Sequence, residues 1–410
     1  MIKPDQLIYV GVDLHKEHHT AVIIDCWNRK LGEFKFDNKP TSFPLLVKEV
    51  KRYTKKELTV VFGLEDVGGY GRALAVYLTE EKHWVKEVNP KLSNARRKSH
   101  VTVQKSDSWD AECVARVLKD ELHNLPDAKP IDLYWAISQL VMQRRWQSKD
   151  LSATVKRLHQ QLVYHYPSYK KFFSEIEGKT ALAFWERFPS PHWLKDVNED
   201  ELARFLRSHS NNGLSTKKAN QIITLIEADG DTYRDYQESR DSIVLAYTRT
   251  IAFLKKELAS VEEKIEGLMK QLGFQLETIT GVNVVTAADL IAEIGDIHRF
   301  SSPDKLARFA GVAPVTVGSG NKHRNHKSKQ GNRVLHDIFK SLAVRQIAVT
   351  RKREPRNPHF YAYYEQRLTA GKTKQQAIVC IMRKLVNVIY KLLKTKSVYV
   401  IPEVSRKLVG

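Results

Sequence analysis

Apolar and polar positions alternate in short blocks over the first 120 residues, and these blocks predict strands interleaved with helices. Two apolar runs separated by a polar turn have the pattern of hairpin strands, and later runs carry helical or extended spacing. The predicted strands are Leu7–Asp13, Thr20–Asp25, Leu31–Phe36, Leu58–Leu64 and Trp84–Val88, and the predicted helices are Phe43–Tyr53, Arg72–Glu80 and Trp109–Leu118. Alternating elements of this kind indicate an α/β domain, which we assign to residues 1–133.

A helical middle region is predicted for residues 134–272. A basic helix with an apolar stripe extends from Tyr134 to about Phe173, and the stretch 182–233 contains helical pieces broken by prolines and a glycine, to which we assign no chemistry. The next apolar positions follow a heptad spacing: Tyr247, Ile251, Leu254, Leu258, Val261, Ile265, Leu268 and Leu272. This spacing favours a coiled coil that joins two subunits, and an amphipathic helix packed inside one subunit is the alternative.

Frequent glycines after Gly273 predict a small, mainly α-helical C-terminal domain at residues 273–395, followed by a tail at 396–410. Its first segment, LETITGVNVVTAADLIAEIGDIHRF, resembles a helix-hairpin-helix, with Gly281 in the hairpin and Ala287 at the helix contact. Asn283 stands where a second glycine is usual, and asparagine tolerates the left-handed conformation of such a turn. Backbone amides of this motif contact phosphates without reading bases.

Charge indicates the class of partner. Sixty-seven Lys and Arg face 47 Asp and Glu, which gives a net charge of +20 and favours a polyanion such as nucleic acid. The three cysteines, Cys26, Cys113 and Cys380, lack the spacing of a zinc site or a disulfide framework, so we expect a reduced, cytosolic setting. No secretory leader and no apolar run of about 18 residues is present, so neither export nor a membrane partner is expected.

Four carboxylates are candidates for a metal site. Asp13 and Glu65 end predicted strands, and Asp107 and Asp110 are spaced to share one face of a helix. Oxygen ligands of this kind suit Mg²⁺, and paired ions can stabilise the attacking and leaving oxygens of phosphodiester chemistry. Taken singly, each acid fits a solvated or capping role, and Asp107 alone fits a helix cap. His15, His18 and His19 raise the alternative of zinc, which a polar turn without a nearby cysteine disfavours.

A serine lies between two glycines in FAGVAPVTVGSGNKHRNHKSKQGNRVL, and this residue is Ser319. A basic run follows it, with side chains suited to phosphate oxygens: Lys322, Arg324, Lys327, Lys329 and Arg333. A nucleophilic hydroxyl fits this setting, and a solvated loop is the alternative that the tripeptide alone favours. His323, His326 and His336 are candidate bases or phosphate contacts without an assigned role.

Together these segments resemble the insertion-sequence transposases of the DEDD type, the family that includes the Piv and MooV invertase group and the bridge-RNA-guided serine recombinases. GVDLHKEHHTAVIID, GLEDVGGYGRAL and KSDSWDAECVARVL are similar to the three acidic blocks of that family. FAGVAPVTVGSG, KQGNRVL and PHFYAYYEQRLTAGKTKQQAIVCIMRKL are similar to its second domain. Gly318 replaces a second serine found in many relatives, and Thr280 and Asn283 replace their usual Pro and Gly.

The resemblance implies a RuvC-like, RNase H-type first domain in which Asp13, Glu65, Asp107 and Asp110 bind Mg²⁺, and a catalytic Ser319 that forms a serine–DNA phosphodiester intermediate. It also implies double-stranded DNA as substrate, a structured non-coding bridge RNA as guide, a homodimer or tetramer, and a prokaryotic, nucleoid-associated location. The basic helix carries residues suited to bind the nucleic-acid backbone: Arg144, Arg145, Lys149, Lys156 and Arg157.

Two other functions remain open at this point. A metal-dependent nuclease or resolvase would cut DNA by water attack, with Ser319 only shaping a phosphate-binding loop. A non-catalytic nucleic-acid-binding protein would use the acids only as helix caps. Replacement of Ser319 tests the first alternative, and replacement of Asp13 tests the second.

Overall fold

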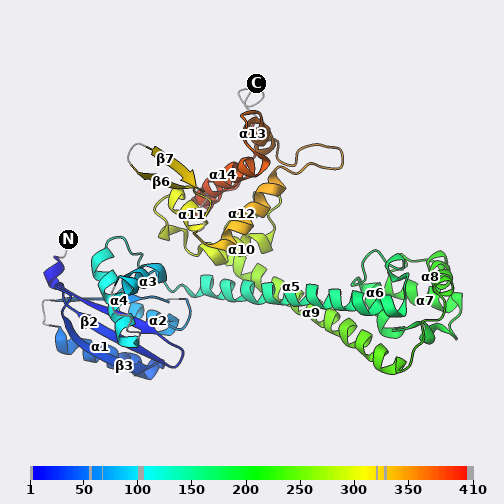
Figure 1. Cartoon of the computed structure of the whole chain (residues 1–410), viewed down its shortest axis with the longest axis horizontal. Helices are drawn as coiled ribbons and strands as arrows, with labels where there is room; N and C mark the ends of the chain where they lie inside the picture. Colours follow the sequence, from blue (N-terminus) through cyan, green and yellow to red (C-terminus); the bar gives the residue numbers. More distant parts are fainter. Residues whose placement is uncertain are drawn as a thin grey trace. The chain divides into compact units, whose positions relative to one another are not determined.

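The computed structural model describes residues 3–54, 58–66, 68–99, 106–319, 322–326 and 330–403, with backbone alone for 315–319 and 322–326. The chain divides into two compact units (Figure 1). The first comprises residues 1–136 together with 295–306, and the second comprises residues 137–294 and 307–410.

The first unit contains a mixed five-stranded sheet with the order β3-β2-β1-β4-β5. Its strands are β1 (Leu7–Leu14), β2 (His18–Ile24), β3 (Lys30–Asp37), β4 (Thr59–Leu64) and β5 (Trp84–Glu87). β2 pairs antiparallel with both β1 and β3. On the other side of the sheet, β1 pairs parallel with β4, and β4 pairs parallel with β5. The α/β pattern predicted from the sequence is confirmed, with strand ends within a few residues of the predicted ones.

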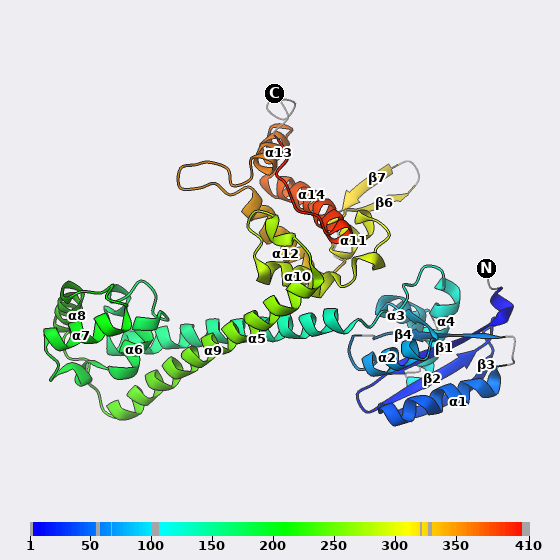
Figure 2. The same ribbon diagram turned by 180° about the vertical axis from the view of Figure 1, so that it is seen from behind.

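Helices cover both faces of this sheet because side chains alternate along its buried strands. Ile8, Val10 and Val12 of β1 belong to a core cluster with α1 (Phe43–Tyr53) and α2 (Arg72–Glu80). The intervening residues of β1 point to the other face, where they pack in a second cluster with α4 (Asp107–Glu121). A further helix, α3 (Pro90–Lys98), is not among the predicted elements. The arrangement of the sheet and α1 can be followed in Figure 2.

The second unit begins with long helices around an aromatic core. α5 (Asp132–His165) ends before Pro167, earlier than the predicted Phe173, because proline lacks an amide donor and disfavours helix in the residue before it. Trp185 and Tyr166 are buried at the centre of this core. The helices that follow are α6 (Lys179–Arg187), α7 (Glu199–His209), α8 (Thr216–Asp229) and α9 (Gln237–Leu272).

The heptad positions lie on one side of α9. Ile251, Val261, Ile265 and Leu272 are buried, and the remaining heptad residues are partly buried, within a single chain. α9 packs against α6 and against α10 (Val284–Ile294). This is the packing expected of an amphipathic helix inside one subunit, and the contact between subunits stays a prediction.

The C-terminal part of the second unit is mainly helical, as predicted, and includes an unpredicted hairpin. Its elements are α11 (Pro303–Phe309), which spans the boundary of the units, then β6 (Val315–Ser319), β7 (Lys322–His326), α12 (Arg333–Gln346), α13 (Pro358–Thr369) and α14 (Lys374–Thr395). Leu335 and Phe339 of α12 and Ile381 and Leu385 of α14 are fully buried.

The predicted helix-hairpin-helix differs from expectation in its first half. A single 3-10 turn, Leu276–Thr278, precedes the bend, and Gly281 has a left-handed φ of 77°. Asn283 does not adopt the left-handed conformation; its side chain accepts a 2.9 Å hydrogen bond from the Thr286 amide and caps α10. Ala287 is buried.

The remaining 3-10 turns are short and lie between the longer elements. They span Pro4–Gln6, Pro40–Ser42, Tyr169–Lys171, Pro191–Leu194 and Ile297–Arg299. Within the residues that the structure describes, no helix combines the length and apolar composition needed to cross a bilayer.

Candidate functional site

The parallel pairing of β1 and β4 brings two acidic residues to one edge of the sheet. Val12 lies opposite Leu64 in the register, so Asp13 and Glu65 are the next residues at the same ends of adjacent strands. Asp13 is still within β1, and Glu65 follows β4 directly. The parallel pairing of β1 with β4 therefore places these two carboxylates side by side, although they are far apart in the sequence.

The other two acids are placed by helix α4, which lies close to β1 because residue 11 is glycine. A Cβ at Gly11 would come within 2.2 Å of the Ala115 amide nitrogen and 2.3 Å of the Ala111 carbonyl oxygen. Asp107 and Asp110 both occupy the first turn of α4. The helix cap is the Ser106 hydroxyl, which accepts a 3.1 Å hydrogen bond from the Trp109 amide, so the capping role considered for Asp107 is wrong.

His15 joins Asp13 to Asp107, and of these two acids His18 contacts Asp107 alone. His15 Nε2 lies 2.9 Å from Asp13 Oδ2 and 3.6 Å from Asp107 Oδ1, and His18 Nε2 lies 3.4 Å from Asp107 Oδ2. Ligand atoms of Asp13, His15 and Asp107 all lie within 4.8 Å of one another, the spacing of a metal-binding cluster. His19, in contrast, is fully buried against Phe36, and its Nδ1 accepts a 3.3 Å hydrogen bond from the His15 amide.

An arginine links the other pair of acids. Arg97 of α3 lies 3.6 Å from Glu65 Oε1 and 3.5 Å from Asp110 Oδ1. Ser93, one turn earlier on α3, donates a 2.9 Å hydrogen bond to Glu65 Oε2 and is itself buried. The four acids thus form two neighbouring pairs, each with one basic side chain between its members.

The electrostatics of the site favour a cation. Burial raises the pKa of Asp13, and the negative charges of Asp110 and Asp107 raise it further, although His15 opposes the shift. Asp110 Oδ1 is buried and, among the described groups, accepts no hydrogen bond, because the 3.5 Å approach of Arg97 is an ion-pair distance without hydrogen-bond geometry. A carboxylate oxygen in this state is stabilised by any positive charge that reaches it.

Sequence reasoning missed or discounted several residues of this site. His15 was considered only as part of a disfavoured zinc site, although it directly follows the end of β1 and is two residues from Asp13. Arg97 and Ser93 carried no signal, because α3 itself was not predicted. Their approach to Glu65 and Asp110 depends on how α3 packs against α4.

The predicted serine site lies in the second unit. Ser319 is the last residue of β6, paired with Lys322 of β7, rather than part of a loop. Arg324 lies in β7 opposite Val317, and Arg333 is the exposed first residue of α12. Lys327 and Lys329 lie outside the described residues. The backbone therefore brings Ser319 beside Lys322.

Two of the arginines predicted to bind nucleic acid, Arg144 and Arg145, have carboxylate partners within the second unit. Arg144 Nε lies 2.6 Å from Glu262 of α9. Arg145 contacts Asp289 at 2.7 Å and Glu293 at 2.5 Å, both on α10. The three other basic residues predicted for this role are exposed: Lys149, Lys156 and Arg157. Among the residues that the structure describes, these three form no ion pair like those that tie Arg144 and Arg145 to neighbouring helices.

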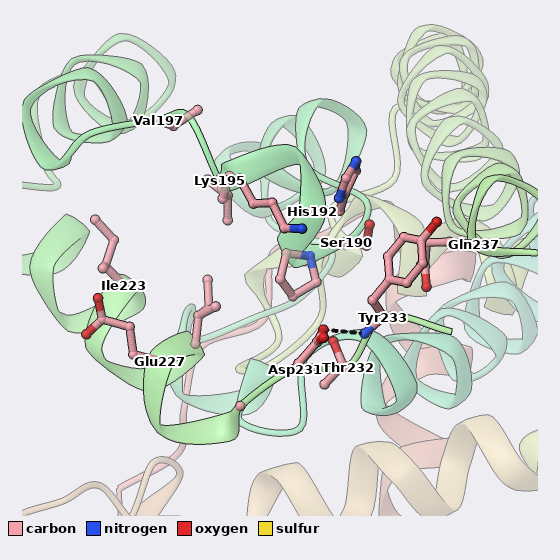
Figure 3. A pocket seen from close by; sticks show the side chains of 14 residues that line it. Ser190, His192, Lys195, Val197, Ile223, Glu227, Asp231, Thr232, Tyr233 and Gln237 are labelled. Carbon is pink, nitrogen blue, oxygen red and sulfur yellow. Dashed lines mark hydrogen bonds between the residues drawn. The ribbon is translucent and has the colours of Figure 1, made fainter. Parts of the chain in front are cut away.

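The stretch 182–233, to which the sequence assigned no chemistry, lines a cavity of about 430 Å³ (Figure 3). Asp241 is buried beside it and accepts hydrogen bonds from Trp193 Nε1 at 2.7 Å, Gln237 Nε2 at 2.8 Å and Ser190 Oγ at 3.0 Å. Because these donors satisfy the carboxylate, the network serves to hold α9 against the preceding turn. Lys195, Glu227 and Asp231 stand around the cavity with mixed charge, which favours no particular ligand.

Comparison with known proteins places both sites in transposase domains. A family profile described as a transposase of the DEDD type from IS110 matches residues 10–167, and a profile described as the transposase IS116/IS110/IS902 family matches residues 274–365. The first match includes all four predicted acids, and the second includes Ser319.

Relatives extend the likeness to nearly the whole chain. The chain is 23% identical over 403 residues to a protein of insertion element IS116 from Streptomyces clavuligerus, covering 96% of each. It is 24% identical over 390 residues to the pilin gene-inverting protein of Moraxella lacunata, covering 94% of this chain and 95% of that protein. A protein of insertion element IS110 from Streptomyces coelicolor is 26% identical over 312 residues, 72% of each chain. With both domains matched in order and these relatives aligned along its length, the chain belongs to the IS110/IS116 family of transposases, enzymes that cut and rejoin DNA.

Proposed function

We propose that this transposase is a site-specific recombinase that joins Ser319 to a DNA phosphate while Asp13, Glu65, Asp107 and Asp110 hold Mg²⁺ in a RuvC-like domain. The observation that carries the proposal is the convergence of four carboxylates from three separate segments on one edge of the sheet. The order β3-β2-β1-β4-β5, with three antiparallel strands followed by two parallel ones, supports an RNase H-type fold for this unit.

The residues present fit a hard divalent cation. They offer carboxylate oxygens, the ligands Mg²⁺ prefers, and the buried Asp110 Oδ1 lacks a hydrogen-bond donor among the described groups. The raised pKa of Asp13 records repulsion that a cation would relieve. Mg²⁺ bound there would supply charge stabilisation for phosphodiester chemistry. Arg97 and His15 hold the acids in place, and Arg97 balances part of their charge.

The proposed chemistry of Ser319 is a transesterification. Its Oγ forms a bond to phosphorus as the bond between phosphorus and the departing sugar oxygen breaks, and the hydroxyl proton passes to a base while the departing oxygen gains a proton. A strand hydroxyl reverses the step by attacking the same phosphorus and releasing the serine. One phosphodiester bond is exchanged for another throughout, so rejoining needs no external energy source.

Guidance by an element-encoded bridge RNA is part of the proposal. Support comes from exposed Lys149, Lys156 and Arg157 on α5, which present positive charge over several turns of one helix. RNA transcribed from the element's non-coding flank is expected to bind wild-type protein more tightly than a variant with glutamine at these three positions. Equal affinity of the wild type and the variant for this RNA would show that α5 is not part of the RNA-binding surface.

The first experiment is the capture of a covalent protein–DNA adduct. Purified protein, Mg²⁺, element-end DNA and the flanking RNA are incubated, denatured and analysed by mass spectrometry, with Ser319→Ala alongside. We expect an adduct on Ser319 in the wild type and at least a hundredfold less in the variant, about the loss typical for removal of a nucleophile or its main support. Thr316→Ala, which removes a hydroxyl elsewhere on β6, serves as the matched control and is expected to retain the adduct.

A metal-only nuclease is the second candidate, favoured by the fact that the acidic cluster gathers its four carboxylates without any group from β6. Magnesium-dependent nicking that survives Ser319→Ala, with no adduct in the wild type, would establish this alternative. Replacement of Asp110 by asparagine is expected to abolish cutting under either mechanism, so it controls for contaminating nucleases.

A further inference from the structure

A large groove in the C-terminal part of the second unit lies outside both candidate sites. It has a volume of about 780 Å³ and lies between the N-terminal half of α14 and the segment Gly311–Pro314, which runs directly into β6. Tyr363 of α13 and His336 of α12 complete its walls, and Cys380 of α14 also faces it. We call it the α14 groove.

Its charge is one-sided. Lys372, Arg383 and Lys384 line the α14 groove, and the sequence has no Asp or Glu between Glu365 and Glu403. α14 thus presents basic residues to the groove without any acidic residue of its own to offset them. A surface of this composition repels cations and favours an anionic occupant.

Two positively charged side chains, Lys384 and Arg367, contact the same tyrosine ring. Lys384 Nζ lies 3.8 Å from the centre of the Tyr363 ring, and Arg367 Cζ lies 4.6 Å from the same ring. Burial lowers the pKa of Lys384, and the charge of Arg367 lowers it further. Arg367 Nε is buried and has no hydrogen-bond partner among the described groups, and neither Arg367 nor Lys384 forms an ion pair with a carboxylate there. Two like charges held together without a counterion are costly unless an anion joins them.

We propose that the α14 groove binds the sugar-phosphate backbone of a DNA strand. Lys384, held against Tyr363, and Lys372, just before α14, line the groove and supply charge for successive phosphates, while Arg367 adds positive charge from its contact with the same Tyr363 ring. Val312, Val379 and the Tyr363 ring offer apolar contact to the sugars between them. DNA is the occupant because the enzyme cuts and rejoins it, and the groove wall continues into the strand that carries Ser319.

This site is separate from the proposed serine chemistry. Its basic lining residues, Lys372, Arg383 and Lys384, lie after residue 365, where the matched transposase profile ends. Binding at the groove requires neither Ser319 nor Mg²⁺, so it can be measured without metal. Failure of the serine mechanism would leave the groove intact, and failure of the groove would leave the adduct experiment unaffected.

The first test measures DNA affinity by fluorescence anisotropy, using full-length protein, EDTA and a labelled duplex of arbitrary sequence. Lys384→Gln is compared with Lys391→Gln, which removes the same charge from an exposed position of α14 outside the groove. We expect Lys384→Gln to weaken binding about fivefold at physiological salt and to lower the slope of log affinity against log salt by about 0.9, the loss of one phosphate contact. Lys391→Gln is expected to leave both values close to wild type.

The second test uses the wild-type chain and so does not depend on a variant that folds. Cys380 faces the groove and is partly exposed, Cys26 is partly exposed in the first unit, and Cys113 is buried with its pKa raised to about 11. Alkylation of each thiol is followed by mass spectrometry with and without duplex DNA. DNA is expected to slow alkylation of Cys380 at least threefold relative to Cys26.

Three results would overturn the proposal. They are equal affinity and salt slope for Lys384→Gln and Lys391→Gln, unchanged alkylation of Cys380 in saturating DNA, and protection of Cys380 by RNA of the same length but not by DNA. The last result would assign the groove to RNA. A circular-dichroism melt of each variant confirms that the compared proteins are folded.

Discussion

At the scale of single residues, the acidic site depends on basic side chains that hold carboxylates together. His15 lies between Asp13 and Asp107, and Arg97 lies between Glu65 and Asp110. Without such partners, four acids at one sheet edge would repel one another and weaken the fold. Burial nevertheless raises the pKa of Asp13, and the neighbouring Asp110 and Asp107 raise it further, against the opposing effect of His15.

Asp13→Asn tests this balance through the pH dependence of stability. Because burial raises the folded-state pKa of Asp13 above its unfolded value of about 3.9, ionisation of this carboxyl opposes folding. The free energy of unfolding of metal-free protein is therefore highest while Asp13 is protonated, and it falls as the pH rises through the folded-state pKa of Asp13. We expect Asp13→Asn to melt at a higher temperature than wild type at neutral pH and at a similar temperature near pH 3.

Thermal melts in EDTA across this pH range give the measurement, with the exposed Asp5→Asn as control. Mg²⁺ is expected to raise the melting temperature of wild type but not of Asp13→Asn, and cutting should fall about a hundredfold or more. A variant less stable than wild type at every pH would show that Asp13 has a purely structural role.

At the scale of elements, the closeness of α4 to β1 decides whether Asp107 and Asp110 reach the sheet edge. Gly11 allows this closeness, because its missing Cβ leaves room for the backbone of Ala111 and Ala115. The strand residues on either side supply the apolar contacts that bury α4. A site built from a strand end and a helix N-terminus thus depends on a glycine that carries no functional group.

Gly11→Ala is expected to separate α4 from β1. The added methyl group would meet backbone atoms, which cannot rotate away, so we expect a loss of about 3 kcal/mol in the free energy of unfolding. Displaced acids should also weaken the stabilisation by Mg²⁺. Urea denaturation with and without Mg²⁺ measures both effects.

Gly68→Ala provides the control, since no atom lies within 4 Å of a Cβ built at that position. It is expected to stay within about 0.5 kcal/mol of wild type. Similar stability of the two variants would mean that the helix can shift without affecting the sheet.

At the scale of the whole molecule, the chain keeps its acidic and basic chemistry in separate units. The four carboxylates belong to the first unit, whereas Ser319 and the α14 groove belong to the second. Charge is uneven within the second unit too: acidic residues slightly outnumber basic ones between 166 and 241, and basic residues strongly outnumber acidic ones between 330 and 403. Much of the basic excess behind the net charge of +20 therefore lies in residues 330–403, which follow Ser319 in the sequence, and not in residues 166–241.

Mixing two inactive variants tests whether the two sites cooperate between subunits. If the active complex is a homodimer or tetramer in which acids of one subunit serve the serine of another, Ser319→Ala and Asp13→Asn proteins should together recover part of the strand-exchange activity. We expect recovery of about a quarter of the wild-type rate, the statistical share when variants mix randomly and one of two sites is complete. No recovery after co-refolding would place both sites within one subunit.

The sequence by itself determined the order and type of most elements, and it named the four acids and the serine as candidates, whose roles stay predictions. Asp13 and Glu65 were predictable because each ends an apolar run of strand length, and Asp107 and Asp110 because a spacing of three residues puts both on one helix face. Family resemblance added a role for Ser319 that its GSG context alone did not indicate. Such features can be predicted from the sequence because they depend only on residues close together in the chain, such as an apolar run or a spacing along one helix.

Only the tertiary structure decided which basic residues contact those acids and which basic side chains line the α14 groove. Arg97 reaches Glu65 and Asp110 through the packing of α3, and Arg144 turns to Glu262, far away in sequence. The α14 groove likewise combines α13, α14 and the segment before β6. Such contacts join residues separated by many positions, and their geometry follows from how buried faces pack, which no local pattern of apolar and polar residues specifies.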